Sequence, residues 1–524
     1  MENKRGGWAS NVGFLLAAIG SAVGLGNIWG FPNKMGAGGG FTFLVVYLAL
    51  GVFVGLPIMV SELALGRGTG RGIIGAYNKA SRKFKWVGWL GVIAPFLILS
   101  FYSVLGGYCM QYMSLNLAEL SFGLSGIFGN QITGSATFDA MLTNPFGCFV
   151  FTMLFVLICM LIVKGGISGG IEKFNKVAMP ALFVMLIVVI IRSLTLPGAE
   201  EGLKFMFVPG YAVSAGFIKE SPNFLKVLGS AGGQMFFSLS LAMGAMITYG
   251  SYLGKNESLA KNSLIIVISD TIIAVMAGLA VIPAAVANSM ASGIPNGEMV
   301  LGGPKLLFIT LQDVFANMGA AGPLFGVLFY LLVLIAAITS AISLMEVVAT
   351  LFIDRAHDAG KEPDRTKITL WIAVAVAVEA LLVASCGLGA NGIAPANILG
   401  KDVMSSPIFM GSWLDFMDCW SEGLAMPLGA LLMAVMVAFE LHPSYTLQEI
   451  NGNKPGFFSK YYKFCIFVAV PVIMIFVLAG QILSFFANVD GSNAAAVELI
   501  GYGVGVVVLL LGIVYALAGK KKAK

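Results

Sequence analysis

The sequence has little charge. Only 11% of its 524 residues are Asp, Glu, Lys or Arg, whereas 58% are hydrophobic. This composition excludes a soluble multidomain protein. Histidine is also scarce, with two residues, and the six cysteines have no metal-ligand spacing or paired pattern. A metal centre built on His and Cys is therefore not expected, and the cysteines are predicted to be buried free thiols.

What the sequence does contain is long apolar runs. About twelve of them approach the ~20 residues that a membrane-spanning helix needs. They lie near 11–32, 42–65, 88–118, 147–164, 177–197, 229–252, 262–287, 323–353, 368–387, 416–439, 463–486 and 496–518. A shorter apolar stretch at 304–321 is flanked by Gly and Pro, and we expect a re-entrant or capping segment there. The predicted fold is an all-α integral membrane protein with a single transmembrane domain over residues 1–524.

Lys and Arg are distributed unevenly among the connecting segments. Six lie from Arg67 to Lys85 and four from Lys520 to Lys524, whereas the loop at 119–146 has none. Short loops rich in Lys and Arg stay on the cytoplasmic side of a membrane. We therefore expect a multi-pass protein of the cell membrane with both termini in the cytoplasm. This topology accounts for the net charge of +5 without a nucleic-acid partner.

Glycine and polar residues interrupt two of the spans. Residues 20–27 read GSAVGLGN in the first span, and residues 232–244 read GGQMFFSLSLAMG in the sixth. Small residues also allow close helix packing in membranes, which is the simpler explanation for one such segment. Two breaks five helices apart favour inverted five-helix repeats, with unwound helices 1 and 6 lining a substrate and ion site. We expect the repeats at about 8–197 and 229–440, followed by two extra helices at about 463–518.

Several further segments carry distinctive motifs in a fixed order. They are GSAVGLGNIWGFP (20–32), GLPIMVSELALGR (55–67), SFYSVLGGY (100–108), FFSLSLAMGAMITYGSY (236–252), DTIIAVMAGL (270–279) and AAITSAISL (336–344). Together they resemble the neurotransmitter:sodium symporter family, and especially its bacterial amino-acid transporters, over nearly the whole chain. The resemblance implies a symporter, not an enzyme, that imports neutral, hydrophobic or aromatic amino acids with sodium by alternating access. Its partners would be the amino acid, sodium and the lipid bilayer, and it would be a monomer or weak dimer.

The same resemblance implies two sodium ions, which as hard cations suit oxygen ligands. The first would be bound by Ala22, Asn27, Ser238 and Asp270. The second would be bound by Gly20, Val23, Ala336, Thr339 and Ser340. A carboxylate such as Asp270 in an apolar span is costly and indicates function unless it belongs to a structural ion pair. Chloride-dependent relatives have Asn at this position and Ser at the position of Ala274, so we expect no chloride requirement.

For the substrate, the resemblance implies a site between the two broken helices. Its carboxylate would meet the N–H groups near Leu25 and Gly26 and the Tyr102 hydroxyl, because a helix N-terminus favours an anion. Its ammonium group would be held by the carbonyls of Ala22, Phe237 and Ser240, beside Ser238. Its side chain would lie among Ser21, Gly24, Ile98, Phe237, Met243, Ser340 and Leu344. Monoamine carriers of the family place Asp where Gly24 stands, so Gly favours a substrate that brings its own carboxylate.

The gates and the pocket each contain one departure from the family pattern. Arg5 and Asp354 would close the inner pathway, with Trp8, Ser251 and Tyr252 around them, and Asp418 would belong to the outer gate. However, Gly30 replaces the Arg that usually pairs with this Asp, and Lys34, one helical turn later, is the candidate substitute. Ala242 replaces a common Gly of helix 6, and we expect its methyl group to shrink the pocket.

Two alternatives stay open at this stage, and a third has no support in the sequence. Gly30 leaves room for the same fold with a small imino acid, glycine, a γ-amino acid or a taurine-like substrate. An uncoupled amino-acid sensor or channel is a second alternative, which the complete sets of candidate sodium ligands disfavour. An intramembrane enzyme would need a catalytic cluster such as paired Asp residues, a Ser–His pair or an HExxH motif, and the spans contain none.

Overall fold

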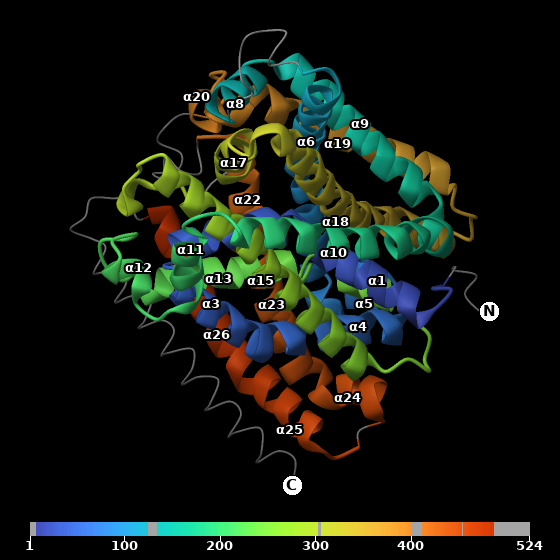
Figure 1. The fold of residues 1–524 in the computed structure, drawn as a ribbon. Helices are drawn as coiled ribbons and strands as arrows, with labels where there is room; N and C mark the ends of the chain where they lie inside the picture. Colours follow the sequence, from blue (N-terminus) through green and yellow to red (C-terminus); the bar gives the residue numbers. More distant parts are fainter. Residues whose placement is uncertain (1–6, 124–133, 302–304, 400–410, 453, 487–524) are drawn as a thin grey trace.

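The computed structural model describes residues 7–123, 134–301, 305–399, 411–452 and 454–486 (Figure 1). All regular elements within these ranges are helices. Nine of them are long and apolar enough to cross a membrane, and a bent pair at the start of the chain makes a tenth. The predicted twelfth span, 496–518, lies outside the described residues, as does Arg5.

The spans include several π-helical segments, labelled η here. Those of the first half are α1 (Asn11–Ala22) with η1 (Gly26–Gly30) and α2 (Phe31–Ala37); α3 (Phe41–Leu50), η2 (Gly51–Gly55) and α4 (Leu56–Thr69); α6 (Val87–Phe122); α9 (Pro145–Lys164); and η4 (Ile167–Glu172) with α10 (Lys173–Leu194). Those of the second half are α15 (Leu259–Ala291); α18 (Gly322–Asp358); α19 (Arg365–Cys386); α22 (Trp413–Asp418), η9 (Cys419–Ala425), α23 (Met426–Val435) and η10 (Met436–Leu441); and α25 (Phe457–Phe464), η11 (Cys465–Ala469) and α26 (Val470–Phe486). The interrupted sixth helix, α13 (Phe224–Ser238) with α14 (Ala245–Gly250), is not among these ten spans.

Shorter helices connect the spans. They are α5 (Ile73–Ala80), α8 (Gly134–Leu142), α11 (Ala199–Phe207), α12 (Tyr211–Ser214), α17 (Leu311–Ala316), α20 (Pro395–Leu399) and α24 (Pro443–Asn451). The segment expected to be re-entrant or capping forms η6 (Leu306–Thr310) and α17, which together are apolar but shorter than a span. It packs against α8, α15 and α18.

The first span breaks where the sequence predicts it. The helix α1 ends at Ala22, and its axis makes an angle of 44° with that of the η1–α2 half. The residues at the break, Val23 and Gly24, are non-helical and buried. Their backbone therefore faces protein, as the absence of water in a bilayer requires.

The break in the sixth span is shorter than predicted. Gly232 and Gly233 lie inside α13, and the non-helical residues are only 239–244. A Cβ atom on Gly232 would approach Val477 Cγ2 within 2.7 Å, so this glycine allows α13 to pack closely on α26. These two glycines therefore serve close helix packing and do not break the helix. Ser240 and Ala242 form the break itself, with φ angles of 51° and 59°.

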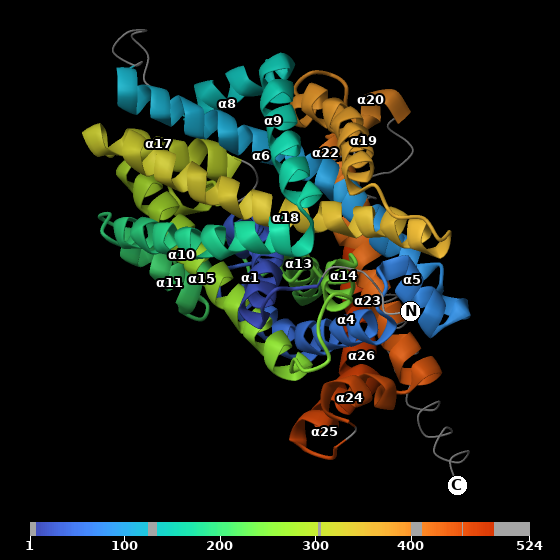
Figure 2. The same cartoon turned by 90° about the vertical axis from the view of Figure 1, so that its right-hand side faces the viewer.

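Both broken spans lie in the interior of the bundle. Figure 2 shows α1, α13 and α14 between α10 and α18 on one side and α4 on the other. The long helices α6 and α18 pack against each other, with α9 and α19 beside them. The non-helical segments of α1–α2 and α13–α14 therefore meet in the protein core, next to α6, α15 and α18.

Candidate functional site

Asp270 is a buried carboxylate in the interior of α15, with none of its surface exposed. Asn27 of η1 donates from Nδ2 to its Oδ1 at 2.7 Å, and the Ser238 hydroxyl lies 2.9 Å from both carboxylate oxygens. In the part of the chain that the structure describes, no Lys or Arg forms an ion pair with it. The structural ion pair left open by the sequence is therefore not found there. Neutral donors alone leave a buried negative charge uncompensated, which favours binding of a cation.

Tyr47 of α3 is a further member of this cluster that the sequence reasoning missed. Its hydroxyl lies 3.3 Å from Asp270 Oδ2 and 3.1 Å from Ser238 Oγ, and the side chain is 1% exposed. One turn along α15, Ala274 is fully buried. A tyrosine in an apolar run usually packs by its ring, so the sequence alone offers no signal for the role of this hydroxyl.

The predicted ligands of the second sodium ion also lie together, where α1 ends against α18. Thr339 Oγ1 is 3.4 Å from the Val23 carbonyl oxygen, and Ser340 Oγ is 3.4 Å from that of Gly20. Thr339 also bonds back to the Ala336 carbonyl at 2.9 Å. Separations of 3.4 Å are long for hydrogen bonds between oxygens. They match neighbouring ligands around a cation with metal–oxygen distances of about 2.3–2.6 Å, and every ligand is an uncharged oxygen. The residues therefore fit a monovalent cation.

The predicted substrate residues surround one cavity beside these two clusters. It is lined by Ser21, Ala22, Gly24, Gly26, Ile98, Tyr102, Phe237, Ser240, Met243, Ser340 and Leu344. Leu25 and Ser238 are adjacent in the chain to lining residues but do not line it. The cavity volume is about 10 Å³, and no lining residue carries a charge. This volume is close to the minimum for one water molecule, so an amino acid fits only after the walls move apart.

One end of the cavity lies at the start of η1, beside Tyr102 and Ser340. The Tyr102 hydroxyl accepts a hydrogen bond from the Leu25 N–H at 2.8 Å. A Cβ atom on Gly24 would lie 2.2 Å from Ser340 Oγ and 2.5 Å from the Tyr102 hydroxyl. Glycine at this position therefore keeps open the space between a hydroxyl pair and the N-terminal end of η1, where an anion is favoured.

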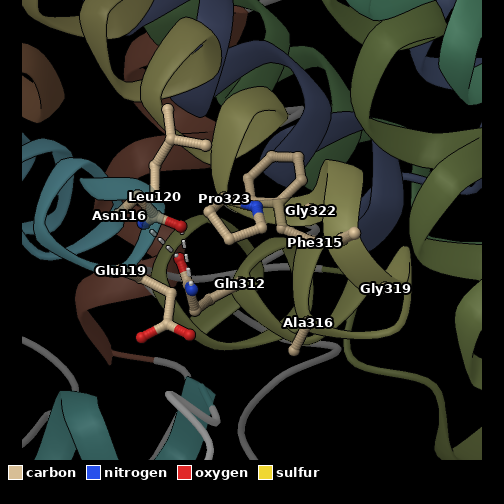
Figure 3. Close-up of a pocket in the computed structure, with 10 residues that line it drawn as sticks. Asn116, Glu119, Leu120, Gln312, Phe315, Ala316, Gly319, Gly322 and Pro323 are labelled. Carbon is tan, nitrogen blue, oxygen red and sulfur yellow. Dashed lines mark hydrogen bonds between the residues drawn. The ribbon is translucent and has the colours of Figure 1, made fainter. Parts of the chain in front are cut away.

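A larger cavity lies elsewhere. It has a volume of about 390 Å³ and is formed by the end of α6, by α17 and by the start of α18. Figure 3 shows the Asn116 and Gln312 side chains facing each other in its wall, where their amides exchange hydrogen bonds of 3.0 and 3.3 Å. None of the residues singled out from the sequence lines this cavity, and its two buried amides satisfy each other.

At the predicted inner gate, Trp8 donates to the Tyr249 carbonyl at 3.1 Å, and Asp354 accepts from the Gly72 N–H at 2.8 Å. Ser251 bonds locally to Thr248. The Tyr252 hydroxyl donates to Glu346 at 3.1 Å.

Glu346 of α18 also pairs with Arg365 at the start of α19. Sequence reasoning missed this buried pair, although a glutamate within an apolar span is a signal for it.

Lys34, the candidate substitute for the usual Arg, forms an ion pair near the predicted outer gate. Its ammonium group pairs with Glu422 of η9, a residue that the sequence analysis did not select. The space next to Gly30 is filled by Gln234, whose Oε1 would lie 2.7 Å from a Cβ atom at position 30. Gln234 also donates to the Gly26 carbonyl at 2.6 Å. The Gln234 side chain of α13 therefore occupies the space next to Gly30. The ion pair with η9 is formed instead by Lys34, one helical turn after Gly30.

The expectation for Ala242 is wrong. Ala242 does not line the cavity; it approaches α23, since a Cβ atom on Gly429 would lie 3.5 Å from its Cβ. Its backbone N–H donates to Glu62 Oε1 at 2.6 Å. The methyl group instead imposes backbone strain, because alanine is held at a φ of 59°.

Replacing Ala242 with Gly is expected to stabilise the protein by about 1 kcal/mol, because glycine adopts the left-handed conformation without steric cost. The gain would appear as a higher midpoint of thermal unfolding in detergent. Ala245→Gly is the matched control: Ala245 begins α14 and is fully buried, so this change should destabilise. A lower unfolding midpoint for Ala242→Gly would show that the methyl contact outweighs the strain.

Comparison with known proteins identifies the family. The sequence model described as "Sodium:neurotransmitter symporter family" matches residues 5–125 and 141–400. A sodium-dependent transporter of Bacillus subtilis (strain 168) is 34% identical, with 92% of this chain and all of the relative covered. Another from Methanocaldococcus jannaschii is 29% identical, with 92% of each covered.

Among solved structures, the crystal structure of MhsT in complex with L-phenylalanine superposes with a TM-score of 0.77 at 32% identity. The match covers 91% of this chain and all of MhsT. The predicted all-α fold, with unwound helices 1 and 6, is thereby confirmed. The chain belongs to the sodium:neurotransmitter symporter family and is a sodium-dependent membrane transporter, not an enzyme.

Proposed function

We propose that this transporter imports neutral amino acids with hydrophobic or aromatic side chains. The observation that carries the proposal is the uncharged cavity between the broken helices. Its end beside Gly24, Leu25 and Tyr102 would receive the substrate carboxylate. A charged side chain would find no partner among its lining residues. The bound L-phenylalanine of MhsT, a protein of similar fold, supports the same substrate class.

Two sodium ions are proposed to drive uptake. The first would be held at Asp270, Asn27, Ser238 and the Ala22 carbonyl, next to the substrate carboxylate, so that each favours binding of the other. The second would be held at the junction of α1 and α18. Each sodium ion that enters with the membrane potential contributes about 2.3 kcal/mol per 100 mV. Because Asp270 supplies a fixed negative charge in the cluster, we propose transport that is independent of chloride.

The transport cycle is proposed to be alternating access around this cavity. Tyr102 and Phe237, with ring centroids 6.3 Å apart, would cover the substrate on the outer side. Asp354 and Arg5 would close the inner side, and both termini would lie in the cytoplasm. The two repeats at about 8–197 and 229–440 would supply the moving and static helices of a monomer or weak dimer.

Thermal unfolding of the purified protein with each of the twenty amino acids, in sodium and in potassium, tests this proposal. A substrate binds only the folded state and raises the unfolding midpoint. We expect stabilisation by phenylalanine, leucine or similar amino acids in sodium and none in potassium, with sodium chloride and sodium gluconate equivalent. Stabilisation by lysine or glutamate would contradict the uncharged pocket.

A second candidate function rests on the altered outer gate. With Gly30 in place of the usual Arg, the same site could receive an imino acid, glycine, a γ-amino acid or a taurine-like compound. If none of the apolar amino acids stabilises the protein, these compounds form the next panel. An uncoupled sensor would show stabilisation that does not depend on sodium.

A further inference from the structure

Asn175 carries a buried oxygen atom without a hydrogen-bond donor. It lies on α10, on the side that faces α1, and none of its surface is exposed. Its Nδ2 atom donates to the Ile171 carbonyl one turn earlier, at 2.9 Å. Its Oδ1 atom accepts no hydrogen bond from the residues that the structure describes. Such an atom is costly to bury and calls for a partner.

The orientation of this amide follows from its contacts. The Ile171 carbonyl oxygen is an acceptor, so the amide group nearest to it must be the donor Nδ2, and Oδ1 points away. On that other side lies Gly20 of α1: a Cβ atom built on Gly20 would be only 2.0 Å from Asn175 Oδ1. The free oxygen therefore abuts the residue whose carbonyl lies 3.4 Å from Ser340 Oγ in the second cation cluster.

We propose that Asn175 Oδ1 is a further oxygen ligand of the second sodium ion, either directly or through one bridging water. This proposal rests on the second sodium site described under the proposed function. An amide oxygen is an acceptor that a hard cation prefers, and it adds no charge to a site made otherwise of carbonyls and hydroxyls. The site would then be built from α1, α18 and α10.

The experiment measures sodium binding without transport. The purified full chain is titrated with sodium, with potassium replacing it at constant ionic strength, and the unfolding midpoint is followed without any amino acid. Because the substrate carboxylate completes the first site in our proposal, this titration reports mainly on the second. Asn175→Ala should raise the half-maximal sodium concentration about tenfold, as losses of supporting groups at metal sites do. Asn175→Asp keeps the oxygen and adds a charge, so it should lower that concentration.

Asn116→Ala is the matched control. Asn116 is also buried, and it also donates from Nδ2 to the carbonyl one turn earlier, that of Tyr112, at 2.9 Å. Its oxygen is already paired with Gln312, so this change should leave the sodium response unaltered. Thr339→Ala is the positive control, since it removes a ligand of the second site itself.

The outcomes separate this inference from the function on which it rests. If the parent protein shows no sodium stabilisation, or Thr339→Ala has no effect, the second sodium site itself fails. If Thr339→Ala weakens the sodium response and Asn175→Ala does not, Asn175 is not part of the site. Equal destabilisation by Asn175→Ala in sodium and potassium would point to a water bound independently of sodium, and would also overturn the proposal. If Asn175→Ala does not fold, Asn175→Asp provides the test: an unchanged half-maximal sodium concentration for this variant would overturn the proposal.

Discussion

Asp270→Asn is expected to raise the sodium concentration for half-maximal amino-acid uptake about 100-fold or more in chloride-free buffer. The reason is electrostatic: at an effective dielectric constant of about 20, opposite unit charges 4 Å apart attract by about 4 kcal/mol. Asn keeps the size and the contacts with Asn27 and Ser238 but removes the charge. Added chloride should recover part of the uptake by supplying a negative charge to the cluster.

Uptake into proteoliposomes, with sodium varied against potassium and chloride against gluconate, measures both effects. Asp313→Asn is a suitable control, because it removes a carboxylate of α17 that accepts from the Gly134 N–H and does not line the predicted substrate cavity. An unchanged sodium dependence together with no response to chloride would remove Asp270 from the first sodium site. Protein stability should be checked in parallel, because a neutral side chain can even stabilise a buried position.

Removing either charge of the Lys34–Glu422 ion pair is expected to have the second largest effect, and this effect is on the stability of the protein. Lys34→Met should destabilise the protein by about 3 kcal/mol, because it leaves the Glu422 carboxylate, which is 7% exposed, without this partner. Glu422→Gln should destabilise it less, because Lys34 is 21% exposed and also interacts with the Asp418 carboxylate. The double variant should be less destabilised than the sum of the two, with a coupling energy of about 1–3 kcal/mol. Each single change should also slow uptake if this pair replaces the usual outer latch.

The pair formed by Lys83 and Glu440 is the control for this double-mutant cycle. Its lysine side chain is 77% exposed, compared with 21% for Lys34, so its coupling energy should not exceed about 1 kcal/mol. Thermal unfolding gives both energies in the same detergent. A coupling energy for Lys34 and Glu422 as small as that of the exposed pair would mean that the outer closure depends on other contacts.

The spans within the described residues and the first break could be predicted from local sequence, because apolar length and helix-breaking residues act within one segment. The second break shows the limit of this reasoning. Gly232 and Gly233 look like breakers, yet they remain helical because α26 packs against them. The strained residues are Ser240 and Ala242, which intrinsic propensity would not place at positive φ.

In the site, too, some features follow from local sequence and others from the packing of distant helices. Asp270 could be selected from sequence because an acid in an apolar span is rare. Its partner Tyr47 is 223 residues away in the chain, and Gln234 bonds to Gly26 across 208 residues. Such pairs depend on how the helices assemble, which no periodicity within one helix encodes. Lys34 could be named from the sequence as the candidate substitute for the usual Arg, but its acceptor, Glu422, required the structure.

All six cysteines are buried and unpaired, so none of them presents a reactive thiol at the protein surface. Maleimide dyes react with an accessible thiolate, so they should leave these thiols unmodified in the folded protein. A single cysteine introduced at an exposed position would then be labelled selectively in the otherwise native chain. Distance measurements between two such dyes could follow the opening of each gate in single molecules without first removing the natural cysteines.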